Sequence, residues 1–356
     1  MDPTLPYNQI SQIVNISPPT VKKRINNLKR QSILQGIHAE YHPEALGLES
    51  HIFLLRVNSI DKLLLLERVL DYHPYLVIRS RCYGAITGIF MKVHIPEGTI
   101  DKMKLFLEHL KDYDLISEIV HSTTIGKGIK TRIDLTYWDQ KTAQWLFKWT
   151  LWNANKDSVD YVPHFSYFQR LSHEKPKNVL KRMKHYDFQI LHKLVLDATQ
   201  KQSLLAEEIG IPQYTFSRRL KFLNENVIRN YVVTFDRMFF GLTDELIFKA
   251  VCSKRAMSKI IYLLQNLPLP FESDFRSTED GFLWKILLPP DHKLELMNIL
   301  WALFPDLQIM MLDPDTARTK PFNPENYSFS DKQWKDTYEF MVDSILQKAR
   351  KEQILA

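Results

Sequence analysis

Two stretches of the chain, about 195 residues apart, carry the same alternation of apolar and polar positions. A helix predicted over 18–30 places Val21, Ile25 and Leu28 on one face, and a helix predicted over 213–224 has a matching apolar face. A shorter helical segment and a turn precede each helix, and a strand-like segment follows it. After the second helix, residues 228–235 are expected to form a pair of strands, the usual wing. This order predicts a winged helix-turn-helix in each stretch.

The two stretches also share identical residues at one offset. Because internal repeats determine the architecture of a chain, we interpret this chain as a tandem repeat of one structural unit. The matched pairs are Thr20 and Thr215, Arg24 and Arg219, Leu28 and Leu223, and Ile33 and Ile228.

The first unit lacks a helix that the second unit has. Phe188 and Leu191 mark a helical face before the second helix-turn-helix, whereas only six residues precede Tyr7. Either this helix lies upstream of the given residues, or another segment of the chain packs in its place. The best internal candidate is a helix expected over 331–353, with Trp334, Tyr338, Met341, Ile345 and Leu346 on one face.

After each winged helix the pattern changes to strand, helix, strand, strand, helix, strand, over 51–124 and 246–312. Such units form an antiparallel sheet with helices on one face, so a second sheet must cover the bare face. The expected class is therefore α+β. We expect a winged helix at 1–45, a ferredoxin-like sheet domain at 46–126, a basic aromatic helical connector at 127–184, a second winged helix at 185–238, a second ferredoxin-like sheet domain at 239–314 and a C-terminal helix at 315–356.

Composition adds little to this pattern. A chain of 356 residues with 45% hydrophobic content is expected to fold into two to four domains. No apolar run is long enough to span a bilayer. Cys82 and Cys252 are expected to be reduced core thiols, which predicts a cytoplasmic protein.

The positive charge is concentrated in one segment. Residues 127–185 hold 12 Lys and Arg against 5 Asp and Glu, which accounts for the net charge of +6. Any nucleic-acid contact must therefore be local. Within this segment the basic run Lys175, Lys177, Lys181, Arg182 and Lys184 either binds phosphate or is a solvated linker. We expect the neighbouring aromatics to pack rather than stack on bases; they are Trp138, Trp145, Phe147, Trp149 and Trp152.

Both units resemble leucine-responsive/asparagine-type regulators, the Lrp/AsnC family. The resemblance is carried by ISPPTVKKRINNLKRQSILQGIHAEYHPEALGL and IGIPQYTFSRRLKFLNENVIRNYVVTF, which match its helix-turn-helix and, in the first, its Leu-Gly-Leu lead into the sheet domain. It implies double-stranded DNA as partner, a small-molecule effector at the sheet domains, and a pseudo-dimer within one chain that is compatible with a homodimer. The chain departs from the family at the Gly-x-x-Asp turn, which reads YGAITG (83–88) and TEDGFL (278–283).

On these helices, basic residues would neutralise phosphates, while Asn, Gln, Thr and Ser would reach base edges. The resemblance therefore predicts a transcriptional regulator that reads two half-sites. The candidate DNA-binding residues are Thr20, Lys22, Lys23, Asn26, Asn27 and Arg30 in the first unit and Gln213, Tyr214, Thr215, Ser217, Arg218 and Lys221 in the second.

Enzyme motifs are missing from the sequence. The 12 His residues show no ligand spacing, and there is no Gly-rich phosphate loop or nucleophile elbow, so we expect no enzyme, no cofactor and no metal. Two alternatives stay open. One is an enzyme like the siroheme decarboxylases, with Arg79, Arg81 and His94 holding tetrapyrrole carboxylates. The other is a protein-interaction adaptor that has lost DNA binding.

Overall fold

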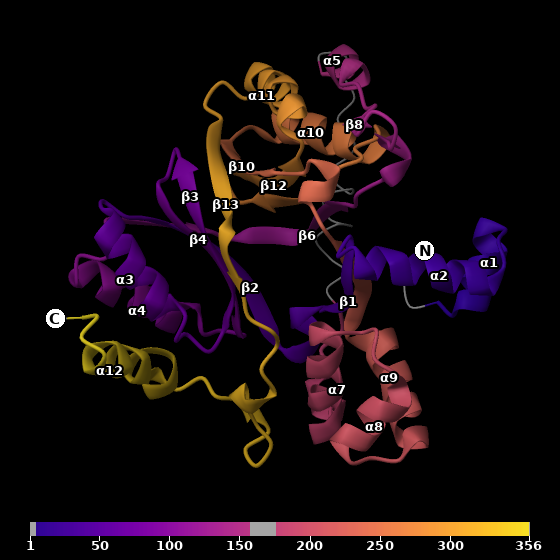
Figure 1. Cartoon of the computed structure of the whole chain (residues 1–356). Helices are drawn as coiled ribbons and strands as arrows, with labels where there is room; N and C mark the ends of the chain where they lie inside the picture. The colour runs from indigo at the N-terminus through magenta and orange to yellow at the C-terminus, as the bar shows by residue number, and fades with distance from the viewer. Residues whose placement is uncertain (1–4, 157–175, 356) are drawn as a thin grey trace.

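The computed structural model of the chain describes residues 5–156 and 176–355, and it confirms the α+β class (Figure 1). The first winged helix consists of α1 (Tyr7–Val14), α2 (Pro18–Arg30) and β1 (Leu34–Tyr41). Ser17 is extended and Pro18 follows at the first helical position, where its fixed φ favours the start of α2. Within the described residues, no helix is both long and apolar enough to cross a membrane.

The second winged helix is larger by one helix. It consists of α7 (His185–Leu196), α8 (Gln202–Ile209), α9 (Gln213–Asn226) and β9 (Ile228–Phe235). We expected two strands in its wing, and this was wrong. Each winged helix supplies one strand, and β1 and β9 pair antiparallel with each other. The pairing provides hydrogen bonds for backbone N–H and C=O groups that two single strands would leave without partners.

The segments that follow the two winged helices contain the same order of elements. The first comprises β2 (Leu48–Arg56), α3 (Ile60–Leu70), β3 (Leu76–Gly84), β4 (Gly88–Pro96), α4 (Ile100–Asp112), β5 (Glu118–Ser122) and β6 (Thr124–Thr131). The second comprises β10 (Asp244–Val251), α10 (Lys254–Asn266), β11 (Ser273–Thr278), β12 (Gly281–Leu288), α11 (Pro290–Leu303) and β13 (Gln308–Thr319). We call residues 5–131 the first unit and residues 185–319 the second unit.

All these strands except β1 and β9 join one nine-stranded sheet in the order β5-β2-β4-β3-β13-β10-β12-β11-β6. The units exchange their last strands. β6 continues from β5 into the second unit and pairs with β11, while β13 pairs first with β10 and then with β3. The two ends of the order, β5 and β6, are separated only by Thr123, so the sheet closes on itself.

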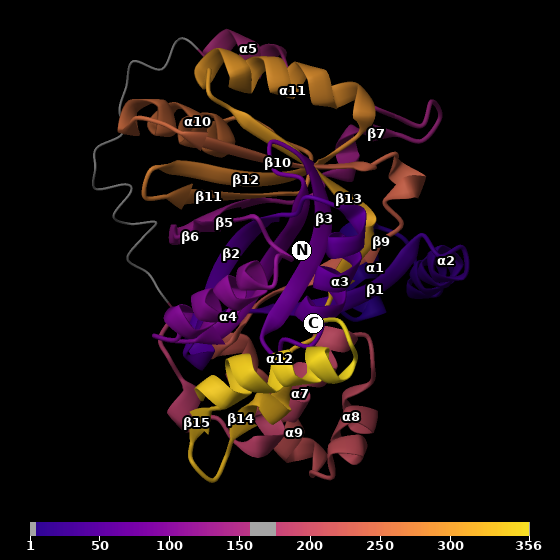
Figure 2. The ribbon, with the colours of Figure 1, turned by 90° about the vertical axis from the view of Figure 1, so that its left-hand side faces the viewer.

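The two halves of this sheet face each other through an apolar layer. Ile52, Leu54 and Phe90 from the first unit are buried against Ile247 and Leu283 from the second. Helices α3 and α4 cover the outer face of one half, and α10 and α11 cover the other, which gives four layers (Figure 2). The predicted second sheet over the bare face therefore comes from within the chain.

The segments that trail each unit cross to the opposite unit. A two-stranded hairpin of β7 (Trp138–Asp139) and β8 (Gln144–Trp145) lies on the second unit, and one of β14 (Tyr327–Ser328) and β15 (Gln333–Trp334) lies on the first. The Trp145 indole donates to the Phe240 carbonyl and the Trp334 indole to the Leu46 carbonyl, both at 2.8 Å.

The connector is therefore not the helical segment that we predicted. It supplies β6 and the β7–β8 hairpin, and its described helices are α5 (Thr150–Asn155) and single short turns. The expectation that its aromatics pack is confirmed. Trp145, Phe147, Trp149 and Trp152 are at most 6% exposed, in the core of the second unit.

The C-terminal segment does not pack in place of the helix that the first winged helix lacks. Residues 331–353 form β15, a π-helical turn (Glu339–Asp343) and α12 (Ser344–Lys351), which pack against α3 and α4. Their apolar side chains, Met341 and Ile345 among them, complete the core of the first sheet domain. The amphipathic pattern was identified correctly, but its partner surface was not.

Candidate nucleic-acid interface and the charged cluster between the units

Helix α2 presents most of its predicted DNA-binding residues to solvent. Lys22, Lys23, Asn26 and Arg30 are exposed, whereas Thr20 and Asn27 are half-buried. The helix contains five basic residues and no acidic residue. Among the described residues neither lysine has an ion pair. The Asn27 side-chain oxygen accepts a hydrogen bond from Arg30 at 3.1 Å, so these two side chains are held together.

Helix α9 presents a comparable but less charged face. Gln213, Tyr214, Ser217, Arg218 and Lys221 are exposed, and Thr215 is half-buried. The Arg218 guanidinium lies 5.7 Å from the centre of the Tyr214 ring, and the Lys221 ammonium lies 3.9 Å from the Glu225 carboxylate. The outward surface of α9 is therefore exposed to solvent. It carries less unpaired positive charge than the outward surface of α2.

The matched arginines of the two helices have different surroundings. In the second unit Arg219 forms a two-pronged ion pair with Asp187 of α7, at 2.5 and 2.7 Å, and the Asp187 side chain is fully buried. Arg219 is thus a structural residue. Arg24, its counterpart on α2, is exposed and has no hydrogen bond or ion pair within the described residues.

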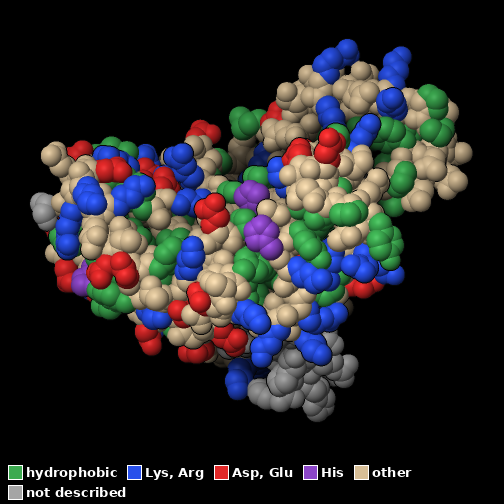
Figure 3. Space-filling model, turned by 90° about the horizontal axis from the view of Figure 1, so that it is seen from below, with side chains coloured by type: hydrophobic (Ala, Val, Ile, Leu, Met, Phe, Trp, Pro, Cys, Tyr) green, Lys and Arg blue, Asp and Glu red, His purple; other side chains and the backbone are tan. Residues whose placement is uncertain are grey.

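The surface charge is uneven. Seen from below, Lys and Arg side chains gather on the right-hand side of the molecule, the side on which α1 and α2 lie, and acidic side chains lie mainly toward the left (Figures 1 and 3). In the connector, Lys177, Lys181 and Lys184 are exposed, and the Arg182 guanidinium lies over the Phe222 ring. Lys175 lies outside the described residues.

A second candidate site lies between the two sheet halves. It gathers Lys92 of β4, Lys130 of β6 and Arg276 of β11, with Asp274 and Glu40 as the acidic members. Arg276 pairs with Asp274 at 2.6 Å and Lys130 with Glu40 at 3.0 Å. Lys92 has no ion pair in the described part of the chain, and burial lowers its pKa to about 8.

His94 lies beside this cluster and is buried. Its Nδ1 is 3.0 Å from the Tyr41 hydroxyl, and its Nε2 has no hydrogen-bond partner among the described residues. Burial, reinforced by Lys92 and two other cations, holds the pKa of His94 well below its usual range. At neutral pH the ring is therefore uncharged.

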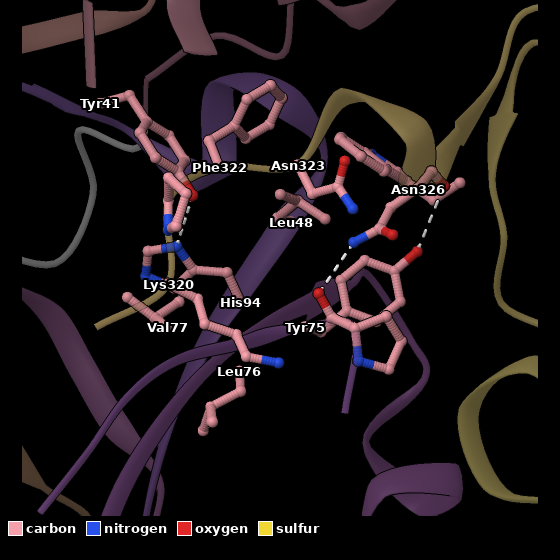
Figure 4. Close-up of a pocket in the computed structure, with 13 residues that line it drawn as sticks. Tyr41, Leu48, Tyr75, Leu76, Val77, His94, Lys320, Phe322, Asn323 and Asn326 are labelled. Carbon is pink, nitrogen blue, oxygen red and sulfur yellow. Dashed lines mark hydrogen bonds between the residues drawn. The ribbon is translucent and has the colours of Figure 1, made fainter. Parts of the chain in front are cut away.

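His94 and Tyr41 also line a small pocket (Figure 4). Other walls come from Tyr75 of the first unit and from Lys320 and Phe322 of the segment after β13. The cavity volume is about 30 Å³, which is room for about two water molecules. In Figure 4 the Nε2 edge of His94 faces away from this pocket.

Arg79 and Arg81, the two arginines proposed as carboxylate ligands, form ion pairs with acidic residues of the chain. Arg79 pairs with Glu67 at 2.9 Å and with Asp71 at 2.8 Å, and Arg81 pairs with Glu67 at 2.8 Å. Arg79 is only 6% exposed. These side chains tie β3 to α3, so only His94 of the three predicted residues lies at the charged cluster.

The described residues contain no group of three or more side chains suited to hold a metal ion. The closest histidine pair is His51 and His121, whose ring nitrogens are 3.2 Å apart. Burial lowers the pKa of His121 to about 4, so a neutral ring can donate to its neighbour. Both cysteines are free, and burial raises the pKa of Cys82 to about 12.

Sequence reasoning missed the charged cluster. The signal was present in β4, where Phe90, Lys92 and His94 alternate on the face that meets the other sheet half. A lysine at an inward position of a strand is uncommon, because an unpaired buried charge is costly. The partners from β6 and β11 were not foreseeable, because they depend on the exchange of strands between units.

The chain is similar in part to several known proteins. Residues 2–35 match the family of winged helix-turn-helix DNA-binding domains. The siroheme decarboxylase NirDL has a similar structure, with a TM-score of 0.52 at 12% identity over 98% of this chain and 94% of that chain. Escherichia coli AsnC is similar over 35% of this chain and 83% of its own, at 19% identity and a TM-score of 0.29. Bacillus subtilis LrpC is similar over 37% and 94%, at 17% identity and a TM-score of 0.31. No curated protein matches the chain in sequence.

These results correct one expectation. We predicted that the chain is not an enzyme, and the full-length similarity to a siroheme decarboxylase contradicts this. At 12% identity that similarity establishes the fold. The chain thus combines a winged helix-turn-helix DNA-binding domain with a fold that an enzyme also uses.

Proposed function

We propose that the chain is a sequence-specific DNA-binding transcriptional regulator built from two tandem units of the Lrp/AsnC type. The observation that carries the proposal is the outward face of α2, which is exposed, basic and free of acidic residues. Such a helix within a winged helix-turn-helix domain fits the major groove of a duplex.

The residues divide by chemistry. Lys22, Lys23 and Arg30 would neutralise phosphates, which supplies most of the affinity and makes it depend on salt. Asn26 and Thr20 would contact base edges, with Asn27 positioned beside Arg30. On α9, Arg218 and Lys221 would contact phosphates, and Gln213, Tyr214, Thr215 and Ser217 would face the bases.

The pairing of β1 with β9 supports a joint use of both helices. Because each wing contributes one strand to the pair, the two winged helices are linked through their wings as well as through the chain. Two half-sites on one face of B-DNA would lie about 34 Å apart or a multiple of that distance. A small-molecule effector at the sheet domains would act by changing this linkage.

The test is binding to duplexes selected from genomic DNA, with shuffled duplexes for comparison. Lys22→Ala with Lys23→Ala should weaken binding to both, whereas Asn26→Ala should reduce mainly the preference for selected duplexes. A double variant with exposed lysines changed elsewhere, Lys141→Ala with Lys351→Ala, controls for net charge. Equal affinity of the chain for both duplexes, unchanged by the α2 variants, would overturn the proposal.

A second candidate function is chemistry on a polycarboxylated ligand at the charged cluster. The full-length fold shared with the siroheme decarboxylase NirDL favours it, as does the presence of Lys92 without an ion pair beside His94. Lys92, Lys130 and Arg276 would hold carboxylates as cations. The small volume of the neighbouring pocket means that a tetrapyrrole would have to open the layer between the sheet halves.

This candidate has its own test, which uses iron-uroporphyrin III as the probe. We expect Lys92→Met to weaken probe binding, measured by the shift of the porphyrin absorbance band, by tenfold or more, while Lys351→Met leaves it unchanged. Loss of carboxylate as carbon dioxide, with a proton taking its place on the carbon, would be followed by mass spectrometry. No band shift for the unmodified chain would exclude the candidate.

A further inference from the structure

The charged cluster between the sheet halves contains one more cation than it contains carboxylates. Arg276 donates to both Asp274 oxygens, at 2.6 and 3.1 Å, and Lys130 pairs with Glu40 at 3.0 Å. Lys92, the third cation, has no ion pair in residues 5–156 and 176–355. A partly buried cation is stabilised by a nearby anion, so one further negative charge would complete the cluster.

His94 provides a hydrogen-bond donor beside Lys92. The two residues are two positions apart on β4, so their side chains lie on the same face of the sheet. The Nε2 of His94 is buried and has no partner among the described residues. Within the same residues, the Tyr41 hydroxyl has one hydrogen bond, at 3.0 Å to Nδ1 of His94. Because a hydroxyl hydrogen needs an acceptor, Tyr41 donates to Nδ1, and the proton of the neutral ring is therefore on Nε2.

The wing strand β1 reaches this cluster with two consecutive residues. Adjacent residues of a regular strand point to opposite faces, but the register of the β1–β9 pair is irregular between Glu40 and Tyr41. A bulge of this kind redirects a side chain. Both side chains contact the sheet, Glu40 through Lys130 of β6 and Tyr41 through His94 of β4. The first wing is thus attached to the charged cluster at two points.

We propose that Lys92 and the Nε2 of His94 together bind the carboxylate of a small molecule that carries no positive charge, and that its binding holds β1 more firmly on the sheet. One carboxylate oxygen would accept from Nε2, and the other would pair with Lys92. Both carboxylates of the cluster are already paired, so an ammonium group on the ligand would face Lys130 and Arg276 and be repelled. The cluster reaches the surface at Glu40 and Lys130, whose side chains are 38% and 27% exposed.

The effect on β1 follows from the two nitrogens of the His94 ring. A carboxylate that accepts from Nε2 makes Nδ1 a stronger acceptor, and the bond from Tyr41 becomes stronger with it. Because β1 also pairs with β9, the effect extends to both wings. The ligand would then be the small-molecule effector of the proposed regulator, and this last step alone rests on the proposed function.

The probe for the site is pyruvate, a small carboxylate without a positive charge, added to the full chain at constant ionic strength and followed by isothermal titration calorimetry. We expect saturable binding, and Lys92→Met and His94→Phe should each weaken it by tenfold or more. His94→Gln keeps an N–H donor and should lose less than His94→Phe. L-Alanine is similar in size but carries an ammonium group, and it should bind at least tenfold more weakly. Lys351→Met, with the same loss of charge at a remote exposed site, should leave binding unchanged.

Amide hydrogen exchange measures the effect on the wing without DNA. Saturating pyruvate should slow exchange along β1 by threefold or more relative to exchange in α12, which lies away from the cluster. Tyr41→Phe keeps the ring but removes the donor to His94. This variant should bind pyruvate more weakly and, when saturated, should show no slowing along β1, because coupling between two contacts is reciprocal.

Three results would overturn the proposal. The first is no saturable binding of pyruvate, or binding that Lys92→Met leaves unchanged, which would remove the site. The second is binding of L-alanine as tight as that of pyruvate, which would remove the ligand class. The third is exchange along β1 that bound pyruvate does not alter, which would remove the effect on the wing. A chain that binds pyruvate but no DNA would contradict the proposed function alone, since neither measurement uses DNA.

Discussion

The two units differ in whether cations at matching positions have ion-pair partners. In the second unit Arg219 is paired with Asp187, and Lys285 with Glu245 at 2.5 Å. In the first unit Arg24 and Lys92, at the matching positions, have no ion pair within the described residues. A paired, shielded charge contributes to a fixed structure, whereas an unpaired one is available to a ligand. We infer that, at these two matched positions, the second unit uses its cations for structure and the first unit leaves them available to a ligand.

Removing the matched arginines tests this contrast with the largest expected effect. Arg219→Ala leaves the Asp187 carboxylate buried without a partner, so the free energy of unfolding should fall by about 3–5 kcal/mol. Arg24→Ala removes an exposed, unpaired side chain and should change it by about 0.5 kcal/mol or less. Urea unfolding of both variants measures the difference. Equal losses would show that Arg24 is also a structural residue.

The matched leucines should differ for the same reason. Leu223 is fully buried, so Leu223→Ala should cost about 2–5 kcal/mol through lost burial and a cavity. Leu28 is 39% exposed, and Leu28→Ala should cost about 1 kcal/mol or less. Thermal unfolding followed by circular dichroism provides the comparison. A large loss of stability for Leu28→Ala would mean that the side chain of Leu28 is covered in solution.

The matched lysines should have effects of opposite sign. Lys285→Met leaves Glu245 without its nearest partner and should lower the free energy of unfolding by about 1–3 kcal/mol. Lys92→Met removes a partly buried cation without an ion pair in the described residues and should raise the free energy of unfolding at pH 7. Because the pKa of Lys92 falls to about 8 in the folded chain from 10.5, the unfolded chain binds more protons between these values, and stability should rise with pH there. The substitution should abolish that rise. If the rise persists in Lys92→Met, another group causes it.

Much of the fold was predictable because the core faces repeat along the chain. Apolar positions at helical spacing identified α2 and α9, and the repeated order of strand, helix, strand, strand, helix and strand included β4 and β12. Matching residues such as Leu28 and Leu223 identified the corresponding positions. Local sequence patterns are sufficient for these features.

The rest depends on contacts between segments far apart in the sequence. The pairing of β6 with β11 and of β13 with β3 exchanges strands between units, and no local pattern encodes such an exchange. For the same reason Lys92 could be seen as an inward lysine, but its neighbour Arg276 could not. The C-terminal segment carried a correct apolar pattern, yet its partner was α3 and α4 rather than α1 and α2.

The most direct measurement is the salt dependence of binding to a selected duplex for two double variants with equal loss of charge. Each phosphate contact contributes about 0.9 to the slope of log affinity against log salt concentration. We predict that Lys22→Ala with Lys23→Ala reduces the magnitude of this slope by about 1.8, and that Arg218→Ala with Lys221→Ala reduces it by less. An unchanged slope for the α2 variant would contradict the assignment of DNA contact to α2. A larger reduction for the α9 variant would contradict the prediction that α2 makes the larger contribution.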